Sequence, residues 1–329
     1  MTHSVADPWF FAAFLAAVVF LLVVDLGVFH RRAHAVTLKE ALGWSIVWVL
    51  LSVLFGSWVY IQFGARSGLE FFTGYLIEYA LSVDNIFVFV LIFSYFAVPP
   101  KLHHRVLFWG ILGAVIMRGC FILAGTALLH SFHWIIYIFG AFLIFTGAKV
   151  LRQHGETKVE PERNPLVRIF QRIIPMTSGY RGGAFLVRQG GKLLATPLAL
   201  VLVTVETTDL VFAVDSIPAI FGVTTDWFIV FTSNICAILG LRSMYFLLAA
   251  VVDRFVYLGV GLGLVLMFVG LKMLIGELIP IGIEVSLAVV AIILGTSVLL
   301  SLIRPGKPTG AKVPAAVPEP PESIPGKNG

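Results

Sequence analysis

The chain has 329 residues, of which 59% are hydrophobic and 12% charged, and its mean hydropathy is +0.97. No soluble domain has this balance, so the lipid bilayer is the expected solvent for most of the chain. The net charge of +5 comes from basic residues that gather between the apolar runs. It therefore indicates membrane orientation and gives no support for nucleic-acid binding.

Apolar runs long enough to cross a bilayer predict nine transmembrane helices. In chain order they lie near residues 8–30, 41–63, 71–96, 106–129, 133–151, 195–221, 227–250, 255–275 and 281–303. The first run has neither a basic start nor a small-residue cleavage site, so we expect a retained helix. Basic residues crowd alternate connections, whereas the opposite side holds Arg66 and almost nothing else. The positive-inside rule then places the N-terminus outside and the C-terminus in the cytoplasm.

The connections indicate how the chain is divided. Apolar runs on either side of Gln189-Gly190-Gly191 predict a β-hairpin in a cytoplasmic loop. The tail is rich in Pro, Gly and Ala, and we expect it to be disordered. The expected units are two N-terminal helices (1–70), two three-helix units (71–151 and 195–275) flanking the loop 152–194, a ninth helix (276–303) and the tail 304–329.

Five carboxylates lie inside spans that are otherwise lipid-soluble: Glu78, Asp84, Glu206, Asp209 and Asp215. Each would cost roughly 2.5–3.5 kcal/mol at the bilayer centre, so we expect all five to face a polar interior. Carboxylate oxygens are hard ligands that suit Mn²⁺, Mg²⁺ or Ca²⁺. The five acids are therefore the predicted metal ligands.

The two acidic spans begin matching three-helix patterns. An acid, five residues, an Asp, a small polar residue and Ile occur at Glu78–Ile86 and at Asp209–Ile217. The next span in each unit carries one arginine, Arg118 or Arg242, and the third carries Gly-x₆-Gly-x-Lys, at 140–149 and 263–272. Because three helices is an odd number, the second copy must enter the membrane from the opposite side. This pattern predicts an inverted repeat.

The acids within one span do not point the same way on a straight helix. Residues six apart, such as Glu78 and Asp84, differ by about 120° in direction. We therefore expect both acidic helices to be broken, at Asp84–Asn85 and just before Pro218. The alternative is a set of structural ion pairs with Arg118 and Arg242, but five acids exceed two arginines, and a divalent cation would offset the surplus.

The remaining polar groups fall into three classes. Arg118 and Arg242 are predicted to balance charge. The eight histidines lie at span ends or in loops, which disfavours an imidazole zinc site, and the two cysteines indicate neither a disulfide nor a thiolate site. No nucleotide loop or catalytic triad appears, so an enzyme is not expected. The candidate neutral ligands are Asn85, Thr207, Thr208, Ser216 and Asn234.

The segments EYALSVDN and ETTDLVFAVDSIPAIF resemble the TerC/Alx family of integral membrane proteins. The resemblance covers residues 10–303 and includes FLVRQGGKLLATPL and SNICAILGLRSMYFLL. It implies manganese export from the bacterial cytoplasm and places the family's motif acids on the same five carboxylates. Some members of the family are implicated in membrane-protein assembly.

We therefore expect a multi-pass protein of the bacterial inner membrane that exports divalent metal ions, with Mn²⁺ as substrate, by alternating access. Proton antiport is a candidate driving force, because the same acids can bind protons. The alternative is a non-transporting assembly or metal-stress scaffold. A surplus of buried acids favours transport. The expected partners are the metal ion and the bilayer, with a homo-oligomer or other membrane proteins left open and nucleic acid excluded.

Overall fold

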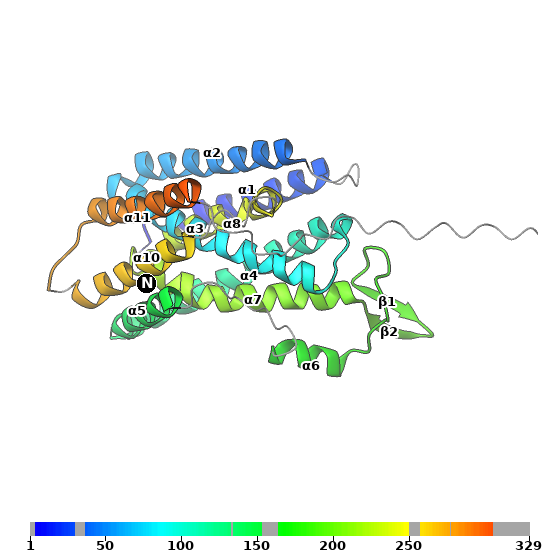
Figure 1. Ribbon diagram of the computed structural model, residues 1–329. Coiled ribbons are helices and arrows are strands. Elements are labelled where there is room, and N and C mark those ends of the chain that lie inside the picture. The colour runs from blue at the N-terminus through cyan, green and yellow to red at the C-terminus, as the bar shows by residue number, and fades with distance from the viewer. Residues whose placement is uncertain are drawn as a thin grey trace, which may run out of the picture.

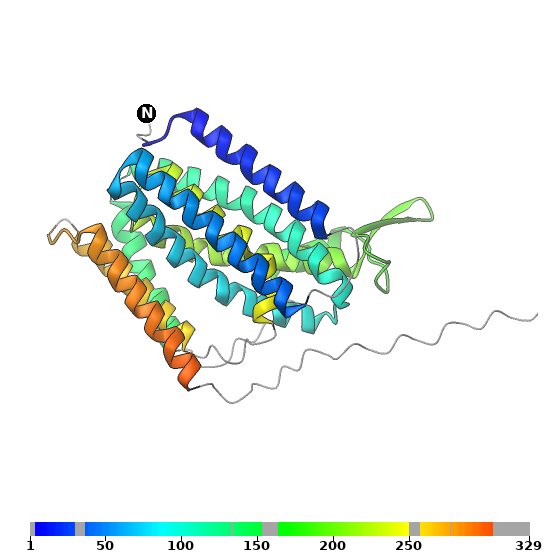
Figure 2. The same cartoon turned by 90° about the horizontal axis from the view of Figure 1, so that it is seen from above.

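The computed structural model describes residues 4–29, 37–132, 134–152, 164–249, 257–276 and 278–304, except for the side chains of residues 25–29 and 84. These residues form a bundle of α-helices with one two-stranded hairpin at an end of the bundle (Figure 1). The N-terminus lies at the opposite end, as Figures 1 and 2 both show. The expected helical polytopic architecture is confirmed.

The helices follow the apolar runs of the sequence. Proline opens α4, α6 and α7, where its missing N–H costs nothing. Thr37 and Glu40 form a capping box at the start of α2. The elements are α1 (Pro8–Phe29), α2 (Leu38–Phe63), α3 (Ala65–Tyr95), α4 (Pro100–Ser131), α5 (Ile135–Arg152), α6 (Pro165–Ile173), β1 (Leu186–Gln189), β2 (Lys192–Ala195), α7 (Pro197–Phe221), α8 (Trp227–Leu239), α9 (Leu241–Leu248), α10 (Leu258–Ile275) and α11 (Ile283–Ile303).

Seven of the described helices are long and apolar enough to cross a membrane, and eight spans result if α8 and α9 count as one. In α1, the apolar helix with described side chains is the shorter segment Pro8–Val24. Nine spans therefore stay a prediction. Large apolar side chains on the outer helices are well exposed, among them Phe20, Leu54 and Ile292 at 66% each. Such a surface suits lipid and not water.

The predicted breaks in the acidic helices are wrong for the described backbone. α3 is helical through Asp84 and Asn85, and α7 is helical through Pro218. Pro218 lies in the last turn of α7, so the helix ends at Phe221 soon after the missing donor. The bend lies instead between α8 and α9, which meet at 42° beside Gly240.

The two acidic helices form the centre of the bundle. α3 packs against α7 and α8, and α4 also packs against α7. In its most apolar stretch α3 is 71% buried, the largest share among the candidate spans of the described chain. α5 and α10 pair with one another, and α11 covers α10 and α3 (Figure 2).

The hairpin projects from the end of the bundle opposite the N-terminus (Figure 2). Its strands are antiparallel, with Leu186 opposite Ala195. Gly190 and Gly191 have φ values of 60° and 78°, which a two-residue hairpin turn requires and glycine adopts without strain. The Tyr180 hydroxyl donates to the carbonyl of Phe96 at 2.8 Å, which ties the segment before the hairpin to the end of α3.

Asp226 connects the two halves of the chain at the other end. Its carboxylate caps α8 by accepting from the amides of Phe228 and Ile229, at 2.9 and 3.2 Å. The same carboxylate accepts from the Ser4 hydroxyl at 3.1 Å and the Val5 amide at 2.6 Å. The start of α1 is therefore held against the start of α8.

Candidate functional site

A polar cluster lies where α3, α4, α7 and α8 meet. It consists of Glu78, Arg118, Asp209 and Asn234, one residue from each of these helices. Three of the four are fully buried, and Asp209 is 3% exposed. Polar groups at such a depth persist only when they bond one another, because water does not reach them.

Arg118 lies at the centre of this cluster. It donates a pair of hydrogen bonds to Asp209, from Nε to Oδ2 at 3.2 Å and from Nη2 to Oδ1 at 3.0 Å. Its Nη1 forms an ion pair with Glu78 Oε1 and also donates to Asn234 Oδ1 at 3.2 Å. The Asn234 amide in turn donates to Glu78 Oε2 at 3.0 Å. One guanidinium therefore holds two carboxylates from different helices.

Glu206 lies three residues before Asp209 on α7, which places it about one turn nearer the hairpin end. It is half-buried. A Cβ added to Gly113 of α4 would collide with the Glu206 carboxylate. Gly113 therefore leaves the space that this acid occupies.

Asp215 lies apart from the cluster. It is half-buried and accepts a hydrogen bond from Thr146 of α5 at 3.3 Å. The side chain of Asp84 lies outside the described residues. Among the side chains that are described, no three His, Cys, Asp or Glu residues gather closely enough to hold a metal ion. The assignment of all five acids as metal ligands stays a prediction.

The candidate neutral ligands have different surroundings. Asn85 is 1% exposed, and neither atom of its amide has a hydrogen-bond partner within the described part of the chain. The hydroxyls of Thr207 and Thr208 both donate to the carbonyl of Thr204, at 3.0 and 2.7 Å. Ser216 is 1% exposed. Only Asn234 among these candidates belongs to the hydrogen-bonded cluster.

One contact was missed because it joins distant parts of the sequence. Asn164 caps α6, and its Nδ2 donates to the Thr207 hydroxyl at 2.8 Å. Arg242, which the sequence predicted to balance charge, is 3% exposed on α9, and that role stays a prediction. The contact of Asn164 with Thr207 could not be anticipated from periodicity, since it depends on how α6 packs against α7.

Glycines let α5 and α10 approach until their backbones touch. A Cβ on Gly147 would lie 2.6 Å from the Gly263 carbonyl oxygen, and one on Gly270 would lie 2.6 Å from that of Gly140. Gly140 faces Gly270 while Gly147 faces Gly263, so the two helices run antiparallel. These are the four glycines of the two Gly-x₆-Gly patterns.

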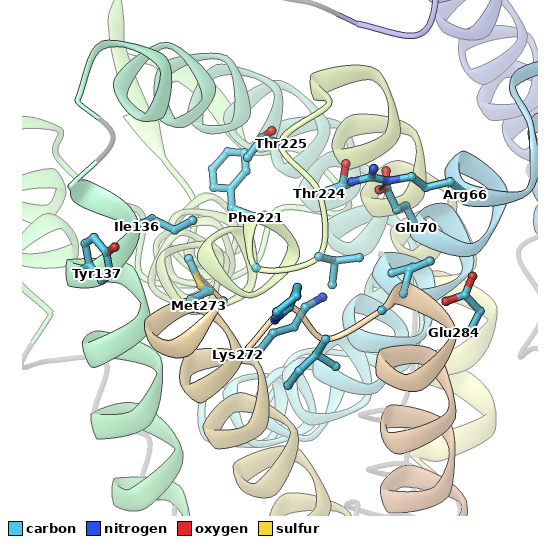
Figure 3. A pocket seen from close by; sticks show the side chains of 17 residues that line it. Arg66, Glu70, Ile136, Tyr137, Phe221, Thr224, Thr225, Lys272, Met273 and Glu284 are labelled. Carbon is cyan, nitrogen blue, oxygen red and sulfur yellow. Dashed lines mark hydrogen bonds and ion pairs between the residues drawn. The ribbon is translucent and has the colours of Figure 1, made fainter. Parts of the chain in front are cut away.

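A cavity of about 680 Å³ opens at the end of the bundle that carries the N-terminus. The ends of α3, α5, α7, α10 and α11 surround it. Figure 3 shows Lys272 reaching from α10 into the space between α3 and α11, with Arg66 and Glu70 side by side on α3. Arg66 and Glu70 form an ion pair at 2.9 Å. Lys272 lies at the end of a predicted span, a position where a lysine needs no functional role.

Comparison with known proteins identifies the family of this chain. The sequence profile described as the integral membrane protein TerC family matches residues 63–308. An uncharacterized membrane protein of Myxococcus xanthus is 55% identical over 92% of this chain and 94% of its own length. Two further relatives are named as candidate membrane-bound redox modulators, Alx. The protein of Escherichia coli K12 is 50% identical over 88% of this chain and 92% of its own length. The protein of Salmonella typhi is 48% identical over 91% of this chain and 95% of its own length. No solved structure matches. The chain belongs to the TerC family of integral membrane proteins.

Proposed function

We propose that this chain is a secondary transporter that exports divalent metal ions, first of all Mn²⁺, from the bacterial cytoplasm by alternating access. The observation that carries the proposal is the buried cluster in which Arg118 bridges Glu78 and Asp209. A buried ion pair adds little stability compared with apolar residues of the same size. A buried ion pair among apolar membrane helices is better explained by a role in binding a charged substrate.

In this proposal the cluster is a cation site in its empty state. The guanidinium of Arg118 stands where the cation binds, and it compensates Asp209 by two hydrogen bonds and Glu78 by an ion pair. When Arg118 moves aside, Glu78, Asp209 and the amide oxygen of Asn234 offer hard oxygen ligands, with water completing the coordination. Mn²⁺ favours such ligands, and two positive charges balance two carboxylates.

The remaining acids of α7 lie at different levels along the helix. Glu206 and Asp215 are nine residues apart, or about 13 Å of helix axis, with Asp209 between them. A single binding cage would need these side chains at one level. Acids that follow one another along a helix suit successive stations of a path, from the hairpin end through Asp209 toward Asp215. Protons returning along the same acids are the candidate driving force.

The packing supports the inverted repeat that the proposal includes. Exchanging the two units exchanges α3 with α7, α4 with α8 and α9, and α5 with α10. Under this exchange the contact of α3 with α8 becomes that of α7 with α4, and both contacts occur. The Gly140–Gly270 contact likewise becomes Gly263–Gly147. Nine spans, an external N-terminus and a site at the repeat interface belong to the same proposal.

The test is uptake of radioactive Mn²⁺ into inverted membrane vesicles, with and without an imposed pH gradient. Glu78→Gln and Asp209→Asn each remove a charge at nearly constant size, so both should abolish uptake. Glu284→Gln is the matched control, since Glu284 is an exposed acid at the start of α11. Uptake by both cluster variants at the control's rate would refute the proposal.

The redox name of the Alx relatives suggests a second role that can be separated from the first. This chain has two cysteines, Cys120 on α4 and Cys236 on α8, and both are free thiols. Export of Mn²⁺, a redox-active metal, would alter redox balance without any thiol reaction in the protein. Replacing both cysteines should then leave Mn²⁺ uptake intact, whereas a thiol-based modulator would lose its effect.

A further inference from the structure

The segment from Asn164 to Ala195 differs from the rest of the chain in charge. It contains five basic residues, two of them on α6, and no acidic residue. Its helix α6 has the sequence PLVRIFQRI, with apolar residues on one side and Arg168 and Arg172 on another. Both arginines are exposed. Such a helix is typical of a protein that binds the surface of a membrane.

The apolar side of α6 is uncovered. Leu166, Ile169 and Ile173 follow one another at helical spacing and are 45%, 50% and 72% exposed. Only Val167 is buried, at 1% exposure, on the helix that contacts α7. Figure 1 shows α6 lying outside the bundle along the first half of α7, near the hairpin. Three large apolar side chains on one face would be unfavourable in water.

The depth of α6 follows from its bond to α7. Asn164 reaches Thr207, which lies ten residues into α7, or about 15 Å along its axis. α7 has 25 residues, so at about 37 Å it exceeds a hydrocarbon core of about 30 Å by some 7 Å. If the whole excess of about 7 Å protrudes at the hairpin end, the start of α6, about 15 Å along α7, lies about 8 Å inside the hydrocarbon core. This is within the usual depth of interfacial helices.

We infer that α6 docks obliquely into the membrane leaflet at the hairpin end, with Leu166, Ile169 and Ile173 among the acyl chains and Arg168 and Arg172 on anionic phospholipid headgroups. The hairpin has the same composition, since Leu186 and Leu193 are 48% and 56% exposed beside Arg188. Through Asn164 the docked helix holds the turn of α7 that carries Glu206. The hydrogen bond from Asn164 to Thr207 thus connects the lipid-docked helix α6 to the acidic helix α7.

The first experiment measures where the two sides of α6 lie. The full chain carries Cys120→Ser and a nitroxide on Ile169→Cys, or on Gln171→Cys as the matched control, in nanodiscs of phosphatidylethanolamine and phosphatidylglycerol. The parent with buried Cys236 alone corrects for background labelling. The label at 169 should collide mainly with oxygen, which concentrates in lipid, and the label at 171 with a water-soluble nickel chelate. Equal collision with the chelate at both positions would overturn the inference, and so would protection of 169 from both probes, which indicates a protein partner.

The second experiment tests the choice of lipid. Arg168→Gln with Arg172→Gln is added to the 169-labelled protein, and the lipid is phosphatidylglycerol-rich or purely phosphatidylcholine. Each arginine should favour the docked state roughly fivefold over an anionic surface. Replacing both arginines should therefore lower collision of the label at 169 with oxygen in the phosphatidylglycerol-rich lipid. In pure phosphatidylcholine the collision with oxygen should not change. An equal fall in both lipids would refute the anionic headgroup as partner. Neither measurement depends on which ion the protein carries, so failure here leaves the transport proposal standing.

Discussion

Arg118 and Asp209, 91 residues apart in sequence, are joined by two hydrogen bonds, from Nε to Oδ2 and from Nη2 to Oδ1. This two-point contact fixes the guanidinium plane between α4 and α7. Lysine could reproduce the charge but not the pair of bonds. This contact therefore requires arginine at position 118.

Arg118→Ala should lower stability by about 3–5 kcal/mol, because it leaves two buried carboxylates without a counter-charge. If the guanidinium stands in for a metal ion, Mn²⁺ should restore much of that loss. The measurement is thermal unfolding in detergent with Mn²⁺ or with an equal concentration of Na⁺ salt. Wild-type protein should gain less from Mn²⁺, since its site is occupied by Arg118. A variant that Mn²⁺ does not stabilise would indicate a purely structural ion pair.

Asp84→Asn and Asp215→Asn should abolish Mn²⁺ export while leaving folding largely intact. Each removes one charge at constant size, and Asp215 keeps a group that can accept from Thr146. Export is measured in inverted vesicles at matched protein levels. Normal export by both variants would contradict the prediction that these two acids are metal ligands.

Gly147→Ala should push α5 away from α10, because the new methyl group would lie 2.6 Å from a backbone carbonyl that cannot rotate aside. Overpacking of this kind costs about 1–3 kcal/mol. The matched control is Gly295→Ala on α11, where an added Cβ meets nothing within 4 Å. Unfolding temperatures of the two variants should differ clearly, with the control at or above wild type. Equal temperatures would show that the helices separate without cost.

Mn²⁺ affinity should rise from pH 6 to pH 8, because carboxylates must release protons to bind a metal. Isothermal titration of the purified protein measures this directly. Replacement of His130, which lies in the last turn of α4, together with His133, outside the described residues, should leave the affinity unchanged. A flat response to pH, or loss of binding without these histidines, would place the metal elsewhere.

Alkaline pH should release the segment before the hairpin. Burial raises the pKa of Tyr180 to about 12, so its neutral hydroxyl is favoured in the folded state. The stabilisation is complete below the ordinary value near 10 and is lost as pH rises toward 12. A dye on Gln189→Cys, in a Cys120→Ser background, should become more mobile over that range by fluorescence anisotropy. Tyr180→Phe should be mobile already at pH 8 and lack this step; an identical step would implicate another group.

The sequence anticipated features that depend on near neighbours. Helical spans follow from runs of apolar residues, and the hairpin from two glycines able to adopt positive φ. The acids were identified because each is costly in lipid. The sequence could not predict which groups the acids pair with, because Glu78 and Asp209 are joined through Arg118 of a third helix. The expected helix breaks were an error of the same origin, because unwinding was invoked to join groups that tertiary packing brings together.

The cavity and the contact of α6 with α7 could not be predicted from the sequence either, because both depend on how distant helices pack. Lys272 comes from α10 and the Arg66–Glu70 pair from α3, two helices distant in sequence, and their common location depends on how α3 and α10 pack. Asn164 resembles an ordinary helix cap until α7 is placed beside it. Single-residue chemistry was therefore easier to predict than the partners of each residue.

The carboxylate of Asp226 has a mechanical consequence for the whole molecule. It accepts hydrogen bonds from the Ser4 hydroxyl and the Val5 amide as well as from two amides of α8, so it joins the segment before α1 to the start of α8. Bonds this short cannot stretch by more than a few tenths of an ångström and persist. In the proposed alternating-access motion, α1 and α8 would have to move together at this end while these bonds hold, so the two proposed moving bodies would differ in size.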